Sequence, residues 1–342
     1  MGRSIFGVQG RASLKNEDVI GFLFWTRFAR PFSTPPLQHL LEEGIPSVWQ
    51  YTINGYGREV EPNVPMLGRA LDDFVALSAR LPSPRCIQWR YDPILLSERY
   101  DYSFHLRCFR QIATALYGAT HVVNTSLVEP YLKAVRRLRD PSVRYRRLDP
   151  ERHRTVAARY PNLGQDAGDA KPLLTDLAGI AAESDMELRL CSNPEYDMSS
   201  SQCCALEGFA PYGPGVIREV AALPRGPSRT GCRCLKTLDI GMDNTCIAGC
   251  RYCYVVQSHK SAVNILVADS GSPSVARQIL PDRISNAVRV KTLNPSIESG
   301  RKPSLLCEVP ENDCILDDEI ATFGHGERDD ANSWIGHPGN VT

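Results

Sequence analysis

Short apolar runs alternate with stretches of helical periodicity along residues 19–192. Five mostly apolar runs predict strands, and they lie at 19–26, 47–53, 85–91, 120–126 and 186–192. Apolar residues at helical spacing predict helices between them, at 35–44, 64–81, 102–118 and 171–185. Strands that alternate with helices in this way are typical of a parallel sheet built from βαβ units.

Two architectures fit this order of elements. Mostly apolar strands favour a (βα)-barrel or part of one, and a doubly wound open sheet is the alternative. The chain has no GxGxxG or GxxxxGK[ST] loop, so nothing marks a nucleotide-binding open sheet. We therefore expect an α/β fold with a partial barrel over 1–195 and a cysteine-rich segment over 196–256.

The periodic pattern stops at about residue 257. Beyond this point the chain is rich in turn residues, as in "NPSIESGRKPS", and acidic residues outnumber basic ones. This composition is typical of poorly ordered chain, so we expect 257–342 to be a poorly ordered tail.

Composition narrows the class of protein without indicating a partner. The chain has 342 residues, of which 42% are hydrophobic, which is enough for a sizeable core. Its formal net charge is zero, so bulk charge indicates neither a nucleic acid nor a membrane surface. No apolar run approaches the length of about 18 residues that a membrane span needs. The first residues show no secretion signal, and we expect a cytoplasmic protein without a membrane partner.

One segment departs from this neutral balance. Residues 133–159 carry ten Lys and Arg against three Asp and Glu, which is the kind of footprint that nucleic acid attracts. Only one aromatic residue, Tyr145, interrupts the segment, so it does not supply a surface for base stacking. The sequence favours a solvated basic linker and leaves nucleic acid as the lesser alternative.

The twelve cysteines carry the clearest chemical signal. Without an export signal, clustered cysteines indicate metal binding or catalysis more than disulfides. Cys246, Cys250 and Cys253 are spaced CxxxCxxC. Three thiolates can hold three irons of a 4Fe–4S cluster and leave the fourth iron open. The alternative is zinc, with Cys232 and Cys234 as nearby thiols that could complete the site.

A second set of cysteines precedes this motif. A second cluster would need four thiolates, and Cys191, one of Cys203 or Cys204, Cys232 and Cys234 would supply them. A zinc site and unligated buried thiols are the alternatives.

Four stretches of the chain together resemble one family. They are "FLFWTR" at 22–27, "QYTINGYGREVEPNVP" at 50–65, "WRYDPILL" at 89–96 and "CRCLKTLDIGMDNTCIAGCRYCY" at 232–254. In this order they resemble the domain-of-unknown-function 1848 family, whose members carry a radical-SAM-like cysteine cluster near the C-terminal end. The resemblance covers roughly 1–256. It implies a barrel of radical SAM type with the cysteine-rich segment folded over the barrel mouth. Family members usually begin with a further strand and helix that this chain lacks, so we expect a partial barrel without its first strand.

The resemblance also implies a chemistry. In radical S-adenosylmethionine enzymes, the amino and carboxylate groups of S-adenosylmethionine chelate the open iron. An electron from the cluster then releases a 5′-deoxyadenosyl radical, which acts here on a substrate that the sequence does not identify. A reductant such as flavodoxin or ferredoxin is implied as a partner. Tyr252 stands at the position of the family's aromatic residue, which would pack over the adenine.

Polar residues at the predicted strand ends are candidates for holding S-adenosylmethionine, because active sites of parallel barrels lie there. Arg90 is the candidate for the methionine carboxylate, since a guanidinium can bind a carboxylate through two hydrogen bonds. Asp92 or Asn54 would bind the ribose hydroxyls. Alternatively, Arg90 and Asp92 form a structural pair at the strand end.

Three functional hypotheses follow. The first is a radical S-adenosylmethionine enzyme. The second is a non-enzymatic, metal-stabilised module or an inactive truncated relic. The third is a nucleic-acid-directed radical repair enzyme, by analogy with spore photoproduct lyase, and it depends on the basic stretch at 133–159.

Overall fold

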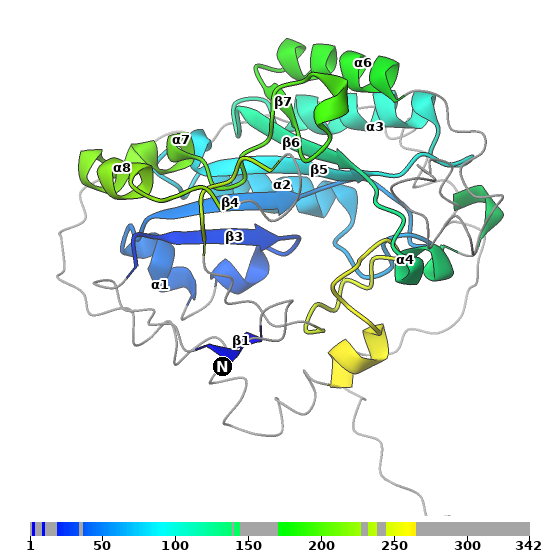
Figure 1. The fold of residues 1–342 in the computed structure, drawn as a ribbon, viewed down its shortest axis with the longest axis horizontal. Coiled ribbons are helices and arrows are strands. Elements are labelled where there is room, and N and C mark those ends of the chain that lie inside the picture. Colours follow the sequence, from blue (N-terminus) through cyan, green and yellow to red (C-terminus); the bar gives the residue numbers. More distant parts are fainter. Residues whose placement is uncertain are drawn as a thin grey trace, which may run out of the picture. The chain divides into compact units, whose positions relative to one another are not determined.

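A computed structural model describes residues 2–3, 9–10, 19–33, 37–138, 140–143, 170–226, 232–237 and 244–264 (Figure 1). The chain divides into two units, Met1–Asn294 and Pro295–Thr342, and every described residue lies in the first. The expected tail beyond residue 264 and most of the basic stretch, residues 139 and 144–159, lie outside the described residues.

Five parallel strands form the central sheet. They are β3 (Phe22–Thr26), β4 (Ser47–Thr52), β5 (Ile87–Ile94), β6 (Val122–Leu127) and β7 (Glu187–Leu190). They lie side by side in chain order, and all five predicted strands are confirmed with bounds that shift by a few residues. A separate antiparallel pair consists of β1 (Gly2–Arg3) and β2 (Gln9–Gly10).

Helices lie between the strands where the periodicity predicts them: α1 (Leu37–Glu42), α2 (Leu67–Ser78), α3 (Tyr102–Ala115) and α6 (Lys171–Glu183). Three further helices were not predicted: α4 (Leu132–Arg137) lies between β6 and α6, and α7 (Leu206–Phe209) and α8 (Pro214–Ala221) follow β7. Figure 1 shows α3 and α6 side by side, and the two helices pack against each other. None of the described helices is both long and apolar enough to cross a bilayer.

One face of the sheet carries the main core. Trp49 and Tyr51 on β4 and Trp89 and Tyr91 on β5 alternate along their strands and are fully buried. Their rings pack on the crossover helices: the Tyr51 ring lies 5.4 Å from Phe74 of α2, centroid to centroid. Trp89 lies 4.6 Å from Phe109 of α3. Successive strand residues point to opposite faces of a sheet, so the residues between these aromatic side chains point to the other face.

The opposite face of the sheet is polar along much of its area. Gln50, Gln88, Arg90 and Asn124 are buried there, in three neighbouring strands. Near the amino end of β4 the same face is apolar, where Val48 packs against Phe209 of α7 and Val220 of α8. The two faces of the sheet therefore differ, with aromatic residues toward the helices and amide side chains toward the segment that follows β7.

The winding of the sheet has no reversal of strand order. Right-handed crossovers between successive neighbours place their helices on a single face, whereas a doubly wound sheet reverses its order and is covered on both faces. Residues of α2, α3 and α6 belong to the same core cluster as the aromatic strand residues, in agreement with single-faced winding. Within the described residues the sheet is open, with β3 and β7 at its edges, so it does not close into a barrel.

Candidate functional site

The polar strand-end residues of β4 and β5 are tied to one another. Asn54 follows β4, and its amide group bridges to β5: Asp92 donates its backbone N–H to Asn54 Oδ1 at 2.8 Å. Asn54 Nδ2 in return donates to the Asp92 carbonyl at 3.1 Å. Two of the predicted cofactor-binding residues therefore meet at the carboxyl edge of the sheet.

The three-cysteine loop lies on this same edge. Asn63, in the connection from β4 to α2, donates its backbone N–H to the Ala248 carbonyl at 3.2 Å and its side-chain amide to the Ile247 carbonyl at 3.0 Å. The backbone N–H of Arg251 donates to the Val60 carbonyl at 2.8 Å. The loop is thus attached to the connection that leaves the carboxyl end of β4.

Arg137, at the end of α4, holds the other side of the loop. Its guanidinium donates to the carbonyl of Cys253 at 2.8 Å and to that of Gln257 at 2.9 Å. Arg137 belongs to the basic stretch that was considered for nucleic-acid binding. Its side chain bonds within the protein, and of the other basic residues of that stretch only Lys133 and Arg136 are described, so nucleic-acid binding stays a prediction.

Tyr252 anchors the loop to the sheet. Its hydroxyl accepts hydrogen bonds from Arg27, which follows β3, and from Asn54 Nδ2 at 3.0 Å, and it donates to Glu61. A phenolic hydroxyl has one proton and can accept from two donors, so its hydrogen-bonding capacity is filled. The Arg27 guanidinium also lies 5.8 Å from the ring centroid and pairs with Glu61, with an N–O distance of 2.9 Å.

Burial controls the protonation of this group. The Tyr252 ring is buried, and burial together with Cys250 and Glu61 raises the pKa of its hydroxyl well above its usual range, against the influence of Arg27. Burial opposes the charge of Arg27, but the nearby Glu61, Tyr252 and Cys250 outweigh it and raise the pKa of the guanidinium. Arg27 therefore remains a cation at the base of the cysteine loop.

The three cysteines of the loop differ in exposure. Cys250 is buried, Cys253 is half-buried and Cys246 is exposed, and Cys250 lies within electrostatic reach of Cys246. Burial raises the pKa of the Cys250 thiol to about 12, and Arg27 opposes the rise. In the described parts of the chain, no three Cys, His, Asp or Glu side chains already stand in an arrangement that could hold a metal ion.

Gly249 lets the loop turn between Cys246 and Cys250. Its φ is +69°, in the left-handed region that favours glycine. A Cβ at this position would meet Asn63 Nδ2 at 3.0 Å and Pro62 Cγ at 3.2 Å. The position therefore needs a glycine for its backbone angle and for its close packing on the β4–α2 connection.

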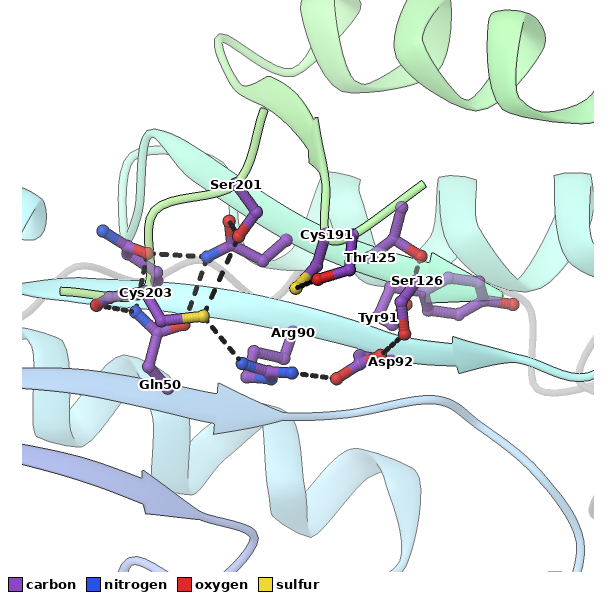
Figure 2. A network of polar contacts seen from close by, with 12 residues as sticks. Gln50, Arg90, Tyr91, Asp92, Thr125, Ser126, Cys191, Ser201 and Cys203 are labelled. Carbon is purple, nitrogen blue, oxygen red and sulfur yellow. Dashed lines mark hydrogen bonds and ion pairs between the residues drawn. The ribbon is translucent and has the colours of Figure 1, made fainter. Parts of the chain in front are cut away.

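Arg90 forms an ion pair with Asp92, as in the alternative interpretation of these two residues as a structural pair. Figure 2 shows its guanidinium pointing to the Asp92 carboxylate on one side and to Cys203 on the other. The distance from Arg90 Nη1 to Cys203 Sγ is 3.2 Å, and Ser126 at the end of β6 donates to Asp92. Arg90 is 9% exposed, so this chain of contacts is buried on the polar face of the sheet.

The second cysteine set converges at this arginine. Interactions with the thiols of Cys191 and Cys234, together with the nearby Arg90, hold the pKa of the Cys203 thiol well below its usual range. The same thiol interactions raise the pKa values of Cys191 and Cys234. The backbone N–H of Cys203 also donates to Cys234 Sγ at 3.2 Å. Cys232 lies within electrostatic reach of Cys234.

The Cys204 side chain lies in different surroundings from that of its neighbour Cys203. Its side chain packs in the apolar cluster with Val48, Phe209 and Val220. Burial there raises the pKa of its thiol to about 11. Of the two adjacent thiols, the one of Cys203 interacts with the thiols of Cys191 and Cys234, and the one of Cys204 faces the apolar cluster.

A row of amides completes the polar face beside Cys203. Gln50 Nε2 donates to Gln88 Oε1 at 2.6 Å and to the Cys203 carbonyl at 3.0 Å. Asn124 Nδ2 donates to Gln88 Oε1 at 2.6 Å, and the Ser201 hydroxyl donates to Asn124 Oδ1 at 2.7 Å. Together these bonds hold residues 201–203 against the sheet (Figure 2).

Sequence reasoning missed the role of Glu61. It is 2% exposed and lies in the connection after β4, in a stretch rich in glycine and charged residues. Its partners Arg27 and Tyr252 are distant in sequence, and Tyr252 is 191 positions away. The signal that could have found it is the negative charge of Glu61. An acidic residue that follows a strand of a parallel sheet can pair with an arginine at the end of a neighbouring strand.

Comparison with known proteins assigns the chain to a family. No curated protein and no solved structure matches it. A family model described as a domain of unknown function matches residues 6–255, which is most of the chain and contains both cysteine sets. The chain therefore belongs to the domain-of-unknown-function family DUF1848.

Proposed function

We propose that the chain is an iron–sulfur protein of the radical S-adenosylmethionine type, with its cluster held by Cys246, Cys250 and Cys253. The observation that carries the proposal is the attachment of the three-cysteine loop to the carboxyl edge of the sheet. Active sites of parallel α/β folds are built at this edge. Tyr252, which lies between two of the cysteines, binds residues that follow β3 and β4.

The winding of the sheet supports a partial barrel as the scaffold. Sequential strand order and crossover helices on one face are what a barrel segment requires. The polar face, with Gln50, Gln88 and Asn124, would then be the inner surface. Its carboxyl end would open toward the cysteine loop, where a cofactor and a substrate could meet.

The donor set fits a cluster with one open iron. Three thiols lie within residues 246–253, and Gly249 allows the chain to bend between them. Thiols lose their protons when they ligate a metal, and burial alone disfavours this for Cys250. The Arg27 cation counteracts that burial and would compensate part of the negative charge of a bound cluster.

The bound cluster would supply the electron that cleaves S-adenosylmethionine into methionine and a 5′-deoxyadenosyl radical. We assign the methionine carboxylate to Arg90, the ribose hydroxyls to Asn54 or Asp92, and the adenine to Tyr252. In the structure these side chains bond to one another, so each would exchange an internal partner for the cofactor. An electron-transfer protein such as flavodoxin or ferredoxin would be the reductant.

Metal analysis of protein purified without oxygen tests the cluster. We expect about four irons and four sulfides per chain, with broad visible absorption. Cys250→Ala should lose them, because the cluster would retain only two protein ligands. Cys86→Ala is the matched control, since Cys86 is a buried cysteine before β5 and should leave the iron content unchanged. Colourless protein with zinc bound to the three-cysteine loop would reject the proposal.

A metal-stabilised module without activity is the second candidate. The observation in its favour is that the Tyr252 hydroxyl and the Asn54 amide are fully engaged within the protein. Such a loop could be held in place for stability alone. A cluster-loaded protein that never cleaves S-adenosylmethionine would favour this candidate over the enzyme.

A further inference from the structure

The CxxxCxxC loop is attached to the sheet in two halves. Residues 246–252 bond to the end of β4 and to the connection that follows it, through Asn54, Val60 and Asn63. Residues 253–257 instead contact α4, which follows β6 (Figure 1). Because β4 and β6 lie on either side of β5, the two halves are fixed at separate points.

This division separates the third cysteine from the first two. Cys246 and Cys250 belong to the first half, and Cys253 begins the second. The backbone N–H of Cys253 donates to the Cys250 carbonyl at 3.1 Å, which closes one turn between the halves. Fixing the backbone of several residues costs more free energy than one such hydrogen bond contributes. The position of Cys253 therefore depends on what holds residues 253–257 against α4.

Arg137, the last residue of α4, makes the polar contacts of this second half with the helix. Its guanidinium donates to three main-chain carbonyls: to that of Cys253 at 2.8 Å, to that of Gln257 at 2.9 Å and to that of Val256. A charged donor forms stronger hydrogen bonds than a neutral one, and the planar guanidinium can serve several acceptors at once. One side chain thus fixes three of five consecutive residues.

An aromatic contact joins the same two segments. The rings of Tyr131, just before α4, and Tyr254 stack with their centroids 5.0 Å apart. Both side chains are 39% exposed, so the stack buries less apolar area than a pair in the core would. The hydrogen bonds of Arg137 therefore contribute most of what fixes residues 253–257 on α4.

We propose that Arg137 is a positioning residue for the third cysteine of the loop. Its guanidinium fixes the backbone from Cys253 onward before a metal binds, and so sets where Cys253 lies relative to Cys246 and Cys250. The inference rests on the proposed function, in which all three cysteines are ligands and a misplaced one weakens the site. The positioning itself is a property of the metal-free chain and can be measured there.

Hydrogen exchange of the metal-free protein, resolved to single amides, tests the positioning directly. In Arg137→Gln the amides of Cys253 and Gln257 should exchange at least about tenfold faster, because the loss of charge-assisted hydrogen bonds lets this half open locally. The Arg251 amide, which is bonded in the first half, should change by less than about twofold. Arg136→Gln is the matched control, because Arg136 is the exposed neighbour on the same helix and should leave both halves unchanged.

Iron retention and reduction potential extend the test to the proposed site. Iron-loaded Arg137→Gln should lose iron to a chelator at least about tenfold faster than the unchanged protein. Arg137→Lys keeps the charge but not the planar fork, so its rate should fall between the two. The reduction potential of Arg137→Gln should be lower, because a nearby cation favours the reduced, more negative cluster, and that of Arg137→Lys should stay close to the unchanged value.

Three outcomes would overturn the proposal. They are a Cys253 amide that exchanges equally fast with and without Arg137, exchange that rises equally in both halves of the loop, and iron loss that Arg137→Gln does not accelerate. A chain that binds no iron rejects the proposed function instead, and hydrogen exchange alone then confirms or overturns the positioning. If Arg137→Gln does not fold, Arg137→Lys gives the same comparison at the same amides, with a smaller expected increase.

Discussion

The hydroxyl of Tyr252 accepts a hydrogen bond from Asn54 Nδ2 at 3.0 Å, across 198 positions of sequence. Tyr252 belongs to the CxxxCxxC loop and Asn54 to the carboxyl end of β4. This contact joins the part of the chain with metal-binding chemistry to the edge of the sheet where ligands of parallel folds bind. Removing the Tyr252 hydroxyl measures how much this contact contributes to the free energy of unfolding.

Tyr252→Phe removes this hydroxyl and should destabilise the fold by about 1–3 kcal/mol, because buried donors and an acceptor lose their partner. The free energy of unfolding in urea measures the effect. Tyr117→Phe is the control, since Tyr117 is 67% exposed and its loss should cost less than about 0.5 kcal/mol. Equal stability of Tyr252→Phe and the unchanged protein would show that the hydroxyl does not anchor the loop.

Glu61→Gln should be more costly, by about 3–5 kcal/mol, because it leaves the Arg27 guanidinium buried without its carboxylate. Glu183→Gln breaks the exposed pair with Arg110 and should cost at most about 1 kcal/mol. Denaturant unfolding of both variants at neutral pH provides the comparison. Similar losses for the two pairs would contradict the claim that the Arg27–Glu61 pair is buried and structural.

Gly249→Ala should destabilise the cysteine loop for two separable reasons. A non-glycine residue at φ +69° is strained by about 1 kcal/mol or more, and its Cβ would crowd Asn63. Gly118→Ala is strained in the same way at φ +75° but meets no atom within 4 Å. The stability difference between the two variants therefore measures the crowding at Gly249, and we expect Gly249→Ala to be the less stable protein.

His105 predicts a pH dependence of stability. Burial lowers its pKa to about 4, while the Leu95 carbonyl and Asp101 oppose the shift. In the unfolded state the histidine has a pKa of about 6.5. Between that pH and about pH 4, the unfolded state therefore binds a proton that the folded state does not bind. Stability should therefore fall as the pH drops from 6.5 toward 4, by about 2 kcal/mol at pH 5.

Replacing this histidine isolates its contribution. In the structure the Tyr91 hydroxyl oxygen lies 2.7 Å from His105 Nδ1, on the helix-covered face of the sheet. His105→Gln should lower stability at pH 7 but weaken the further loss between pH 7 and pH 5. If the variant and the unchanged protein lose the same free energy over this range, His105 is not held neutral in the folded state.

Much of the fold could be predicted from sequence because its main signal is local. Apolar runs and helical spacing predicted the five strands and the helices between them. Closure of the sheet could not be predicted from the same runs. The strands look mostly apolar, yet Gln50 and Gln88 sit beside aromatic residues of β4 and β5, and Asn124 follows a valine in β6. This alternation marks a sheet with one polar face.

The positions of the candidate residues follow from sequence only in part. Cys191 directly follows β7, so its place at the edge of the sheet followed from the predicted strand. Which of Cys203 and Cys204 faces Arg90 could not be predicted, because adjacent residues of an extended segment point in opposite directions and only tertiary packing decides between them. The Arg27–Glu61–Tyr252 group was not predicted, since it forms only when three distant segments meet.

Formation of 5′-deoxyadenosine tests the central claim most directly. Protein purified without oxygen, then given dithionite and S-adenosylmethionine, should release 5′-deoxyadenosine even without a substrate. Cys250→Ala should release none above background, and Cys86→Ala should match the unchanged protein. If protein loaded with iron and sulfide releases no 5′-deoxyadenosine, or if Cys250→Ala releases as much as the unchanged protein, the cysteine loop at the sheet edge is not a radical-generating site.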